Sequence, residues 1–289
     1  MKFPFKIGVI TDEVSQDIFE AAEFASQHEL DCLEVRSVNG HGPFEYTEED
    51  IEDIISASTT YALPVCAISA PLFKCNFTDP DAVKEHLHKL ELCAVAAKRI
   101  GTDIIRGFDF WEENIPLETR AAAYDGVAGI CEQYRVTCVI ESDPTVHSNT
   151  PHKLALLVEK INDPCVKALF DPGNEIWVTG KTSEDAYDIL APYIAHVHIK
   201  DGIVTENGPE AVKIGTGLAD FETIFKKLIS GGYTGAVVLE THYRKQHELT
   251  EEQMKLPGGT AFSDGAWDAS EESIIELKKI IHSCMEVLS

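Results

Sequence analysis

Basic residues are scarce in this sequence, and their scarcity excludes several classes of function. The 289 residues include 24 lysines and arginines against 49 aspartates and glutamates, which gives a formal net charge of −25. A surface this acidic repels phosphate backbones, so no nucleic-acid partner is expected. Hydrophobic runs are also short, and none approaches the ~20 apolar residues of a membrane-spanning helix. We therefore expect a soluble globular protein that does not associate with membranes.

Paired cysteine motifs and a targeting segment are missing as well. The eight cysteines contain no C-x-x-C pair, and the closest two are Cys131 and Cys138. The apolar N-terminal stretch is interrupted by Pro4 and Lys6, so we do not expect it to be a signal peptide. Without export the thiols are expected to stay reduced, and the predicted location is the cytoplasm.

The sequence does contain a regular alternation of short apolar runs with longer segments of helical periodicity. No G-x-G-x-x-G fingerprint follows the first run, which argues against a dinucleotide-binding fold. Eight such units without a break in composition predict a single (β/α)8 TIM barrel over residues 1–289, with a doubly wound open sheet as the alternative. The expected strands are residues 6–10, 32–36, 65–69, 103–107, 137–141, 166–171, 196–200 and 236–240.

Several residues predict where helices begin and end. Thr47, Asp79 and Thr150 are expected N-caps, and Ser270 is expected to begin a helix in the same way. Gly231 and Gly232 are expected to end the helix before the last strand.

The segment 241–269, after the last expected strand, is long for a connecting loop and has little periodicity. It includes His242, Arg244, His247 and Trp267. Long loops in compact domains usually have a function. We predict either a lid over the barrel mouth or a contact within a homo-oligomer.

Four potential metal ligands stand at the ends of the last four expected strands. They are Glu141, Asp171, His198 and Glu240. The carboxyl ends of parallel strands meet at one edge, where α/β proteins place their chemistry. Three carboxylates and an imidazole suit one divalent cation, and manganese, magnesium, cobalt and zinc all fit this set. His196 lies deeper in the same strand and is interpreted as a core or supporting residue.

The chain contains Glu141 after Val-Ile, Asp171-Pro-Gly-Asn174, His198-Ile-Lys-Asp201, Gly215-Thr-Gly-Leu-Ala-Asp-Phe221 and Gly232-Tyr-Thr-Gly235 before Val-Val-Leu-Glu240. These motifs resemble the xylose-isomerase-like sugar isomerase/epimerase superfamily. The resemblance spans nearly the whole chain and implies a barrel with a metal site formed by Glu141, Asp171, His198 and Glu240. It also implies that Glu141 and Glu240 transfer the proton beside a carbonyl that the cation polarises.

The departures from the family pattern limit the choice of reaction. The endonucleases of the superfamily add histidines on the third and fourth strands, where this chain has Ser69-Ala70 and Arg106. Ketohexose 3-epimerases carry a glutamate and a histidine where this chain has His147 and Asn174. The resulting prediction is a sugar or polyol isomerase or epimerase, with a small-molecule carbohydrate substrate. A lyase or dehydratase similar to inosose dehydratase is the alternative.

Further polar residues are predicted to line the barrel mouth and bind substrate. A lysine beside a polarised carbonyl stabilises an oxyanion, and a guanidinium in an apolar strand needs a partner. The Gly215-Thr216-Gly217 turn could hold a phosphate, although a plain turn is the simpler interpretation because no basic residue accompanies it. The predicted substrate-binding residues are Glu34, Arg106, His147, Asn174, Lys200 and His242.

Overall fold

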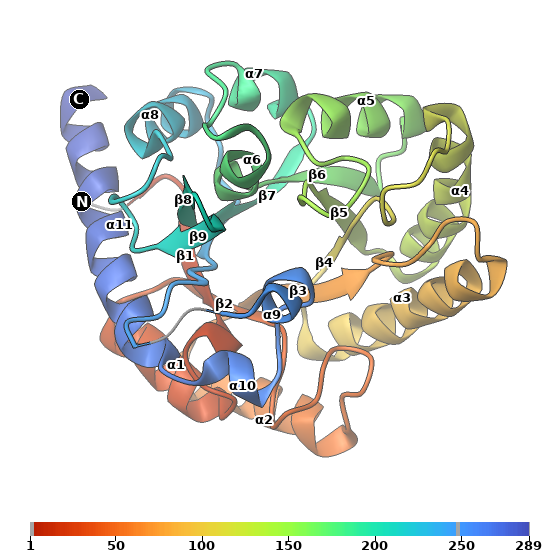
Figure 1. The fold of residues 1–289 in the computed structure, drawn as a ribbon. Coiled ribbons are helices and arrows are strands. Elements are labelled where there is room, and N and C mark those ends of the chain that lie inside the picture. Colours follow the sequence, from red (N-terminus) through yellow and green to blue (C-terminus); the bar gives the residue numbers. More distant parts are fainter. Residues whose placement is uncertain (1–2, 247–248, 289) are drawn as a thin grey trace.

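A closed barrel of eight parallel strands forms the centre of the computed structural model, which describes residues 3–246 and 249–288 (Figure 1). Neighbouring strands pair in chain order, and the last pairs with the first. The predicted (β/α)8 fold is therefore confirmed. The barrel strands are β1 (Lys6–Ile10), β2 (Cys32–Val35), β3 (Val65–Leu72), β4 (Ile104–Gly107), β5 (Thr137–Glu141), β6 (Val166–Phe170), β7 (Ile194–Ile199) and β10 (Ala236–Leu239).

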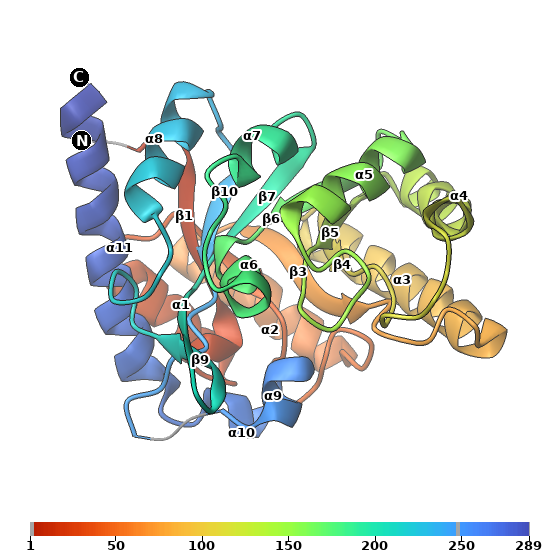
Figure 2. The same cartoon turned by 45° about the horizontal axis from the view of Figure 1, so that its top comes forward.

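Helices surround this barrel and bury its outer face (Figures 1 and 2). Within the described ranges, none of them is long and apolar enough to cross a membrane. The helices around the barrel are α1 (Ile18–Gln27), α2 (Glu48–Tyr61), α3 (Pro80–Ile100), α4 (Leu117–Tyr134), α5 (Pro151–Ile161), α6 (Pro172–Thr179), α7 (Ala186–Leu190), α8 (Phe221–Ser230) and α11 (Ala266–Leu288).

Most of the expected helix ends are found where the sequence predicts them. Thr47 forms a capping box, and the side chains of Asp79 and Thr150 accept backbone N–H groups ahead of a proline. Gly231 follows the last residue of α8. The prediction for Ser270 is wrong, because α11 begins at Ala266 and Ser270 lies inside it. Its hydroxyl instead donates to the Glu13 carbonyl, which satisfies a buried acceptor.

All eight cysteines are free thiols, and most are buried in the core. The expectation of no disulfides is thus confirmed, and a cytoplasmic location stays a prediction.

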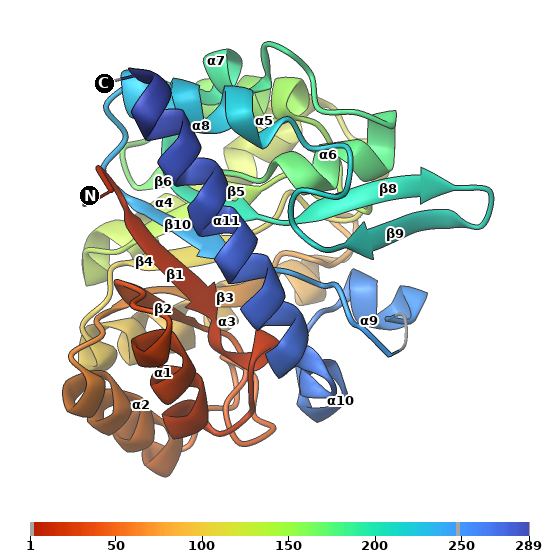
Figure 3. The same ribbon diagram turned by 90° about the vertical axis from the view of Figure 1, so that its left-hand side faces the viewer.

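A two-stranded hairpin not expected from the sequence interrupts the last part of the barrel. Its strands, β8 (Asp201–Thr205) and β9 (Gly208–Val212), pair antiparallel with each other and project beyond the ends of the barrel strands (Figure 3). The Asp201 carboxylate at its base accepts the backbone N–H groups of Gly215, Gly217 and Ala219. The Gly215–Gly217 turn therefore holds an anion that belongs to the chain itself, which agrees with the plain-turn interpretation.

Replacing Gly217 with alanine is expected to destabilise the fold by about 1–3 kcal/mol, the range for overpacking a fitted site. A Cβ there would lie 2.2 Å from Asp201 Oδ1 and 2.6 Å from the Gly202 carbonyl oxygen. Gly129, in α4, has no neighbouring atom within 4 Å of such a Cβ, so its change to alanine serves as the control. Urea unfolding of both variants tests this, and equal stabilities would contradict the close fit.

Candidate active site

The four predicted metal ligands lie together at the carboxyl ends of β5, β6, β7 and β10. One donor atom from each of Glu141, Asp171, His198 and Glu240 lies within 4.8 Å of every other. All four side chains are buried. The structure thus brings together four residues that span 99 positions of the chain, from Glu141 to Glu240.

The Asp-Pro-Gly-Asn motif positions one wall of this cluster through local geometry. Asp171 caps α6, and its Oδ1 accepts the N–H groups of Gly173 (2.8 Å) and Asn174 (3.3 Å), which leaves Oδ2 for the cluster. A Cβ on Gly173 would lie 2.2 Å from Cγ of Lys200, so glycine is needed for close packing. The Asn174 amide donates to Glu141 Oε1 at 2.8 Å and fixes that carboxylate.

Lys200 extends its ammonium group into the middle of the carboxylates. Its Nζ lies 2.8 Å from Asp171 Oδ2, donates to Glu240 Oε2, and is 3.7 Å from Glu141 Oε1. Against the effect of burial, Lys200 and Arg106 hold the pKa of Glu141 at about 2. Burial and the neighbouring carboxylates nevertheless raise the pKa of Asp171 to about 7. One ammonium group therefore does not neutralise this cluster.

Glu34 contacts two histidines of β7, one of which, His198, is a predicted metal ligand. Its carboxylate lies 2.6 Å from Nε2 of His196 and 3.0 Å from Nε2 of His198, and all three residues are buried. Nδ1 of His198 faces Glu240 Oε2 (3.4 Å) and Glu141 Oε1 (3.8 Å), and in the described part of the chain it makes no hydrogen bond. This orientation leaves Nδ1 free to serve as a ligand.

The cluster belongs to a larger buried network of ion pairs. Arg36 contributes most, because it bonds Asp12, Glu13 and Glu240 at 2.8–3.1 Å. Six carboxylates face four lysine and arginine cations in this network, and Glu34 and the other carboxylates raise the pKa of His198 well above its usual value despite burial. The carboxylates are Asp12, Glu13, Glu34, Glu141, Asp171 and Glu240, and the cations are Arg36, Arg106, Lys200 and Arg244.

A small cavity of about 10 Å³ lies directly beside this network. It is lined by four of the predicted substrate-binding residues, Arg106, Asn174, Lys200 and His242, together with Glu141 and Glu240. The other lining residues are Lys74, Phe108, Asp143, Trp177 and Pro257.

The structure does not bring the other two predicted substrate-binding residues to this cavity. Glu34 lies behind the histidines, where its carboxylate is occupied by them. His147 lines a separate surface pocket with Arg120 and Lys153, and its Nε2 accepts the N–H of Glu113. The backbone N–H of His147 donates to the carbonyls of Asp109 and Phe110, so this part of the loop packs against the connection after β4.

The long segment 241–269 contributes Pro257 to the lining of the cavity. It contains α9 (Glu251–Lys255) and α10 (Thr260–Ser263), and both lie at the carboxyl ends of the strands (Figure 3). We name residues 255–263 the covering segment. Ser37 accepts the N–H of Gly259, and Gln16 donates to the Gly259 carbonyl. His247 lies outside the described residues, and the lid over the barrel mouth and the contact within a homo-oligomer both stay predictions.

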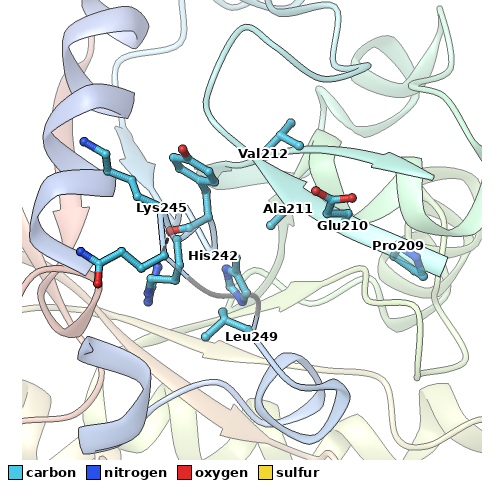
Figure 4. A pocket seen from close by; sticks show the side chains of 10 residues that line it. Pro209, Glu210, Ala211, Val212, His242, Lys245 and Leu249 are labelled. Atoms are coloured by element: carbon cyan, nitrogen blue, oxygen red, sulfur yellow. Dashed lines mark hydrogen bonds between the residues drawn. The ribbon is translucent and has the colours of Figure 1, made fainter. Parts of the chain in front are cut away.

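A larger pocket of about 490 Å³ lies between β9 and the chain after β10 (Figure 4). His242 lines this pocket as well as the small cavity. Its backbone has a φ of +48°, a strained conformation for a residue with a side chain. Burial lowers the pKa of His242 well below its usual value, so the imidazole is neutral.

Several residues of the site were not expected from the sequence. Asp12, Glu13, Lys74 and Asp143 all lie in or beside the network. Asp12 and Glu13 follow the first strand by two and three residues, and Asp143 follows the fifth by two residues. The strand-end rule used for the four ligands could have found these three, whereas Lys74 in its loop carried no such signal.

Comparisons with known proteins agree with the barrel fold described above. The model of the family "Xylose isomerase-like TIM barrel" matches residues 22–257, and no curated protein sequence matches the chain. A D-allulose 3-epimerase from Methylomonas sp. in complex with D-allulose is 15% identical, with a TM-score of 0.74 over 95% of this chain and 96% of that chain. The IolI protein with a bound zinc atom is 17% identical, with a TM-score of 0.72 over 94% and 98%. The probable 3-DHS dehydratase AsbF from Bacillus anthracis is 17% identical, with a TM-score of 0.68 over 90% and 98%.

Proposed function

Because the chain belongs to the xylose isomerase-like TIM barrel family, we propose that it is a divalent-metal-dependent sugar or polyol isomerase or epimerase. The observation that supports this most directly is the convergence of Glu141, Asp171, His198 and Glu240, with donor atoms within 4.8 Å. The bound sugar in the allulose epimerase structure and the zinc in the IolI structure agree with this choice of substrate and cofactor.

The residues fit a divalent cation on three grounds. The donors are three carboxylates and one imidazole, a set that accepts manganese, magnesium, cobalt or zinc. His198 Nδ1 is buried and makes no hydrogen bond among the described residues. The surrounding network holds six carboxylates against four lysine and arginine cations, and a buried excess of carboxylates is costly unless cations balance it. An ion here would take over the oxygens of Asp171 and Glu240 that Lys200 Nζ now contacts.

The chemistry then divides between the cation and the chain. A divalent ion at this position would supply Lewis acidity toward a substrate carbonyl. Glu141 and Glu240 would exchange a proton with the adjacent carbon, one removing it and the other returning it. Lys200 and Arg106, which both line the cavity, would donate hydrogen bonds to the oxygen on which negative charge develops.

A lyase is the second candidate, and His242 favours it. This neutral, buried imidazole lines the cavity, where it could take the proton from the substrate carbon and then give that proton to the departing hydroxyl group, which leaves as water. The structural similarity to the probable dehydratase AsbF agrees with this alternative.

One experiment separates these proposals. Purified protein is analysed for metal and then incubated in deuterium oxide with a panel of keto-sugars and cyclitol ketones. An isomerase or epimerase gives a deuterated isomer of unchanged composition, whereas a dehydratase gives a product that lacks one water. If metal-loaded protein catalyses neither exchange nor water loss with any of them, the proposed function is wrong.

Glu34→Gln is expected to weaken metal affinity by about 10–100-fold, the usual cost of removing a group that orients a ligand. The amide does not hold the two imidazoles as the carboxylate does. Titration with Mn²⁺ followed by calorimetry measures the affinity. Glu175→Gln is the matched control, because Glu175 is equally buried but bonds Ser183 outside the site. Equal affinities of the two variants would contradict a supporting role for Glu34.

A further inference from the structure

Lys74 is a buried ammonium group in the cavity that the proposed chemistry does not use. It follows β3, and its side chain is 1% exposed. Nζ donates to Asp143 Oδ2 at 2.8 Å and to the backbone carbonyl of Lys255 at 2.7 Å. It also lies 4.4 Å from the centre of the Phe108 ring. Lys74 therefore joins the cavity wall to the covering segment.

The Lys255 carbonyl cannot keep this position when a substrate binds. A cavity of about 10 Å³ has room for roughly one water molecule. A sugar enters only if the covering segment moves, because Pro257 of that segment lines the cavity. Movement of Pro257 draws away the carbonyl of Lys255, two residues earlier in the chain.

Loss of that carbonyl leaves a buried ammonium group without one of its two hydrogen-bond acceptors. A charged donor without a partner is costly, so an oxygen of the substrate has to take the vacated place. Asp143 lies beside it, and the backbone N–H of Thr145 fixes its other oxygen at 2.8 Å. The pair thus offers a donor and an acceptor next to each other, which matches neighbouring hydroxyl groups.

We propose that Lys74 and Asp143 recognise two neighbouring hydroxyl groups of the substrate, and that the Lys255 carbonyl takes the place of one hydroxyl oxygen in the closed protein. This inference rests on the proposed function and names a specificity determinant within it. The Asp143 carboxylate cancels the charge of Lys74, so the pair selects an uncharged, hydroxylated end over a phosphorylated or carboxylated one. Lys74 and Asp143 position the substrate and do not transfer its proton.

Hydrogen exchange of the unliganded, full-length protein tests the link to the covering segment. Lys74→Met keeps the length of the side chain but removes the bond to Lys255. Amides of residues 255–262 are expected to exchange at least about 10-fold faster, as the loss of one hydrogen bond to a charged group implies. Lys89→Met is the control, because Lys89 pairs with Glu85 on the surface of α3. Unchanged exchange in Lys74→Met would overturn this link, whether or not any sugar is a substrate.

Steady-state kinetics test the recognition of hydroxyl groups. The probes are ketoses, their singly deoxygenated analogues and ketose 6-phosphates. Lys74→Met is expected to raise KM for the preferred ketose at least about 10-fold, with a smaller change in kcat. For the deoxygenated analogue that lacks the contacted hydroxyl, the wild type and Lys74→Met should have the same KM. An equal rise in KM for every analogue, or a wild-type preference for the 6-phosphate, would refute recognition of the hydroxyl groups by Lys74 and Asp143. If no ketose is a substrate, the proposed function is refuted instead. Hydrogen exchange would then still test whether Lys74 holds the covering segment.

Discussion

Glu240→Gln is expected to lower turnover by about 10²–10⁴-fold, the contribution of one general acid or base. Glu141→Gln should have an effect of the same size. Both carboxylates are held ionised by neighbouring cations, since Lys200 and Arg106 keep the pKa of Glu141 and of Glu240 below the usual range despite burial. An amide preserves the shape of each side chain but accepts no proton.

Loss of metal would produce the same kinetic defect, so metal content has to be measured in each variant. With metal retained, an epimerase with one remaining base should still exchange the substrate proton with solvent from one face. It would then incorporate deuterium without inverting the carbon centre. A lyase would lose activity mainly with the residue that removes the proton. Full activity in either metal-loaded variant would refute the two-carboxylate mechanism and make Lys200 or His242 the next candidate for the base.

Arg36→Met is expected to lower the free energy of unfolding by about 3–5 kcal/mol, the cost of breaking a buried charge network. Arg36 is 1% exposed and pairs with Asp12, Glu13 and Glu240, so its removal leaves three buried carboxylates without this partner. Urea unfolding measures the change. Arg99→Met removes an exposed arginine paired with Glu48 and is expected to leave stability unchanged. If both variants unfold at the same urea concentration as the wild type, Arg36 does not stabilise the network.

The expected strands agree closely with the observed ones because hydrophobic periodicity is a local property. Val166–Phe170 and Ala236–Leu239, for example, each differ from the expected range by only one terminal residue. Ser270 is the instructive failure. Its sequence context is that of an N-cap, but the carbonyl of Glu13, 257 residues earlier, accepts its hydroxyl in the fold. The residues around Ser270 do not predict an acceptor that lies so far away in the sequence.

Some residues of the candidate site could likewise be predicted from the sequence, and others could not. Glu141, Asp171, His198 and Glu240 could be grouped from the sequence because parallel strands end at one edge of a barrel. The position of His147 could not be predicted, because loop direction beyond a strand end depends on contacts with other loops. Its imidazole accepts the N–H of Glu113, which belongs to a different connection.

By itself, the sequence determined the order of the eight barrel strands with the helices between them, the barrel and the four residues at its mouth, since each depends on periodicity or on position along one strand. Only the tertiary structure decided how the charges are paired. Arg36 joins Asp12 to Glu240, and Lys74 joins Asp143 to the carbonyl of Lys255, across 24 to 204 positions of sequence separation. Buried charges select partners by distance and desolvation, and both are set only when the barrel closes.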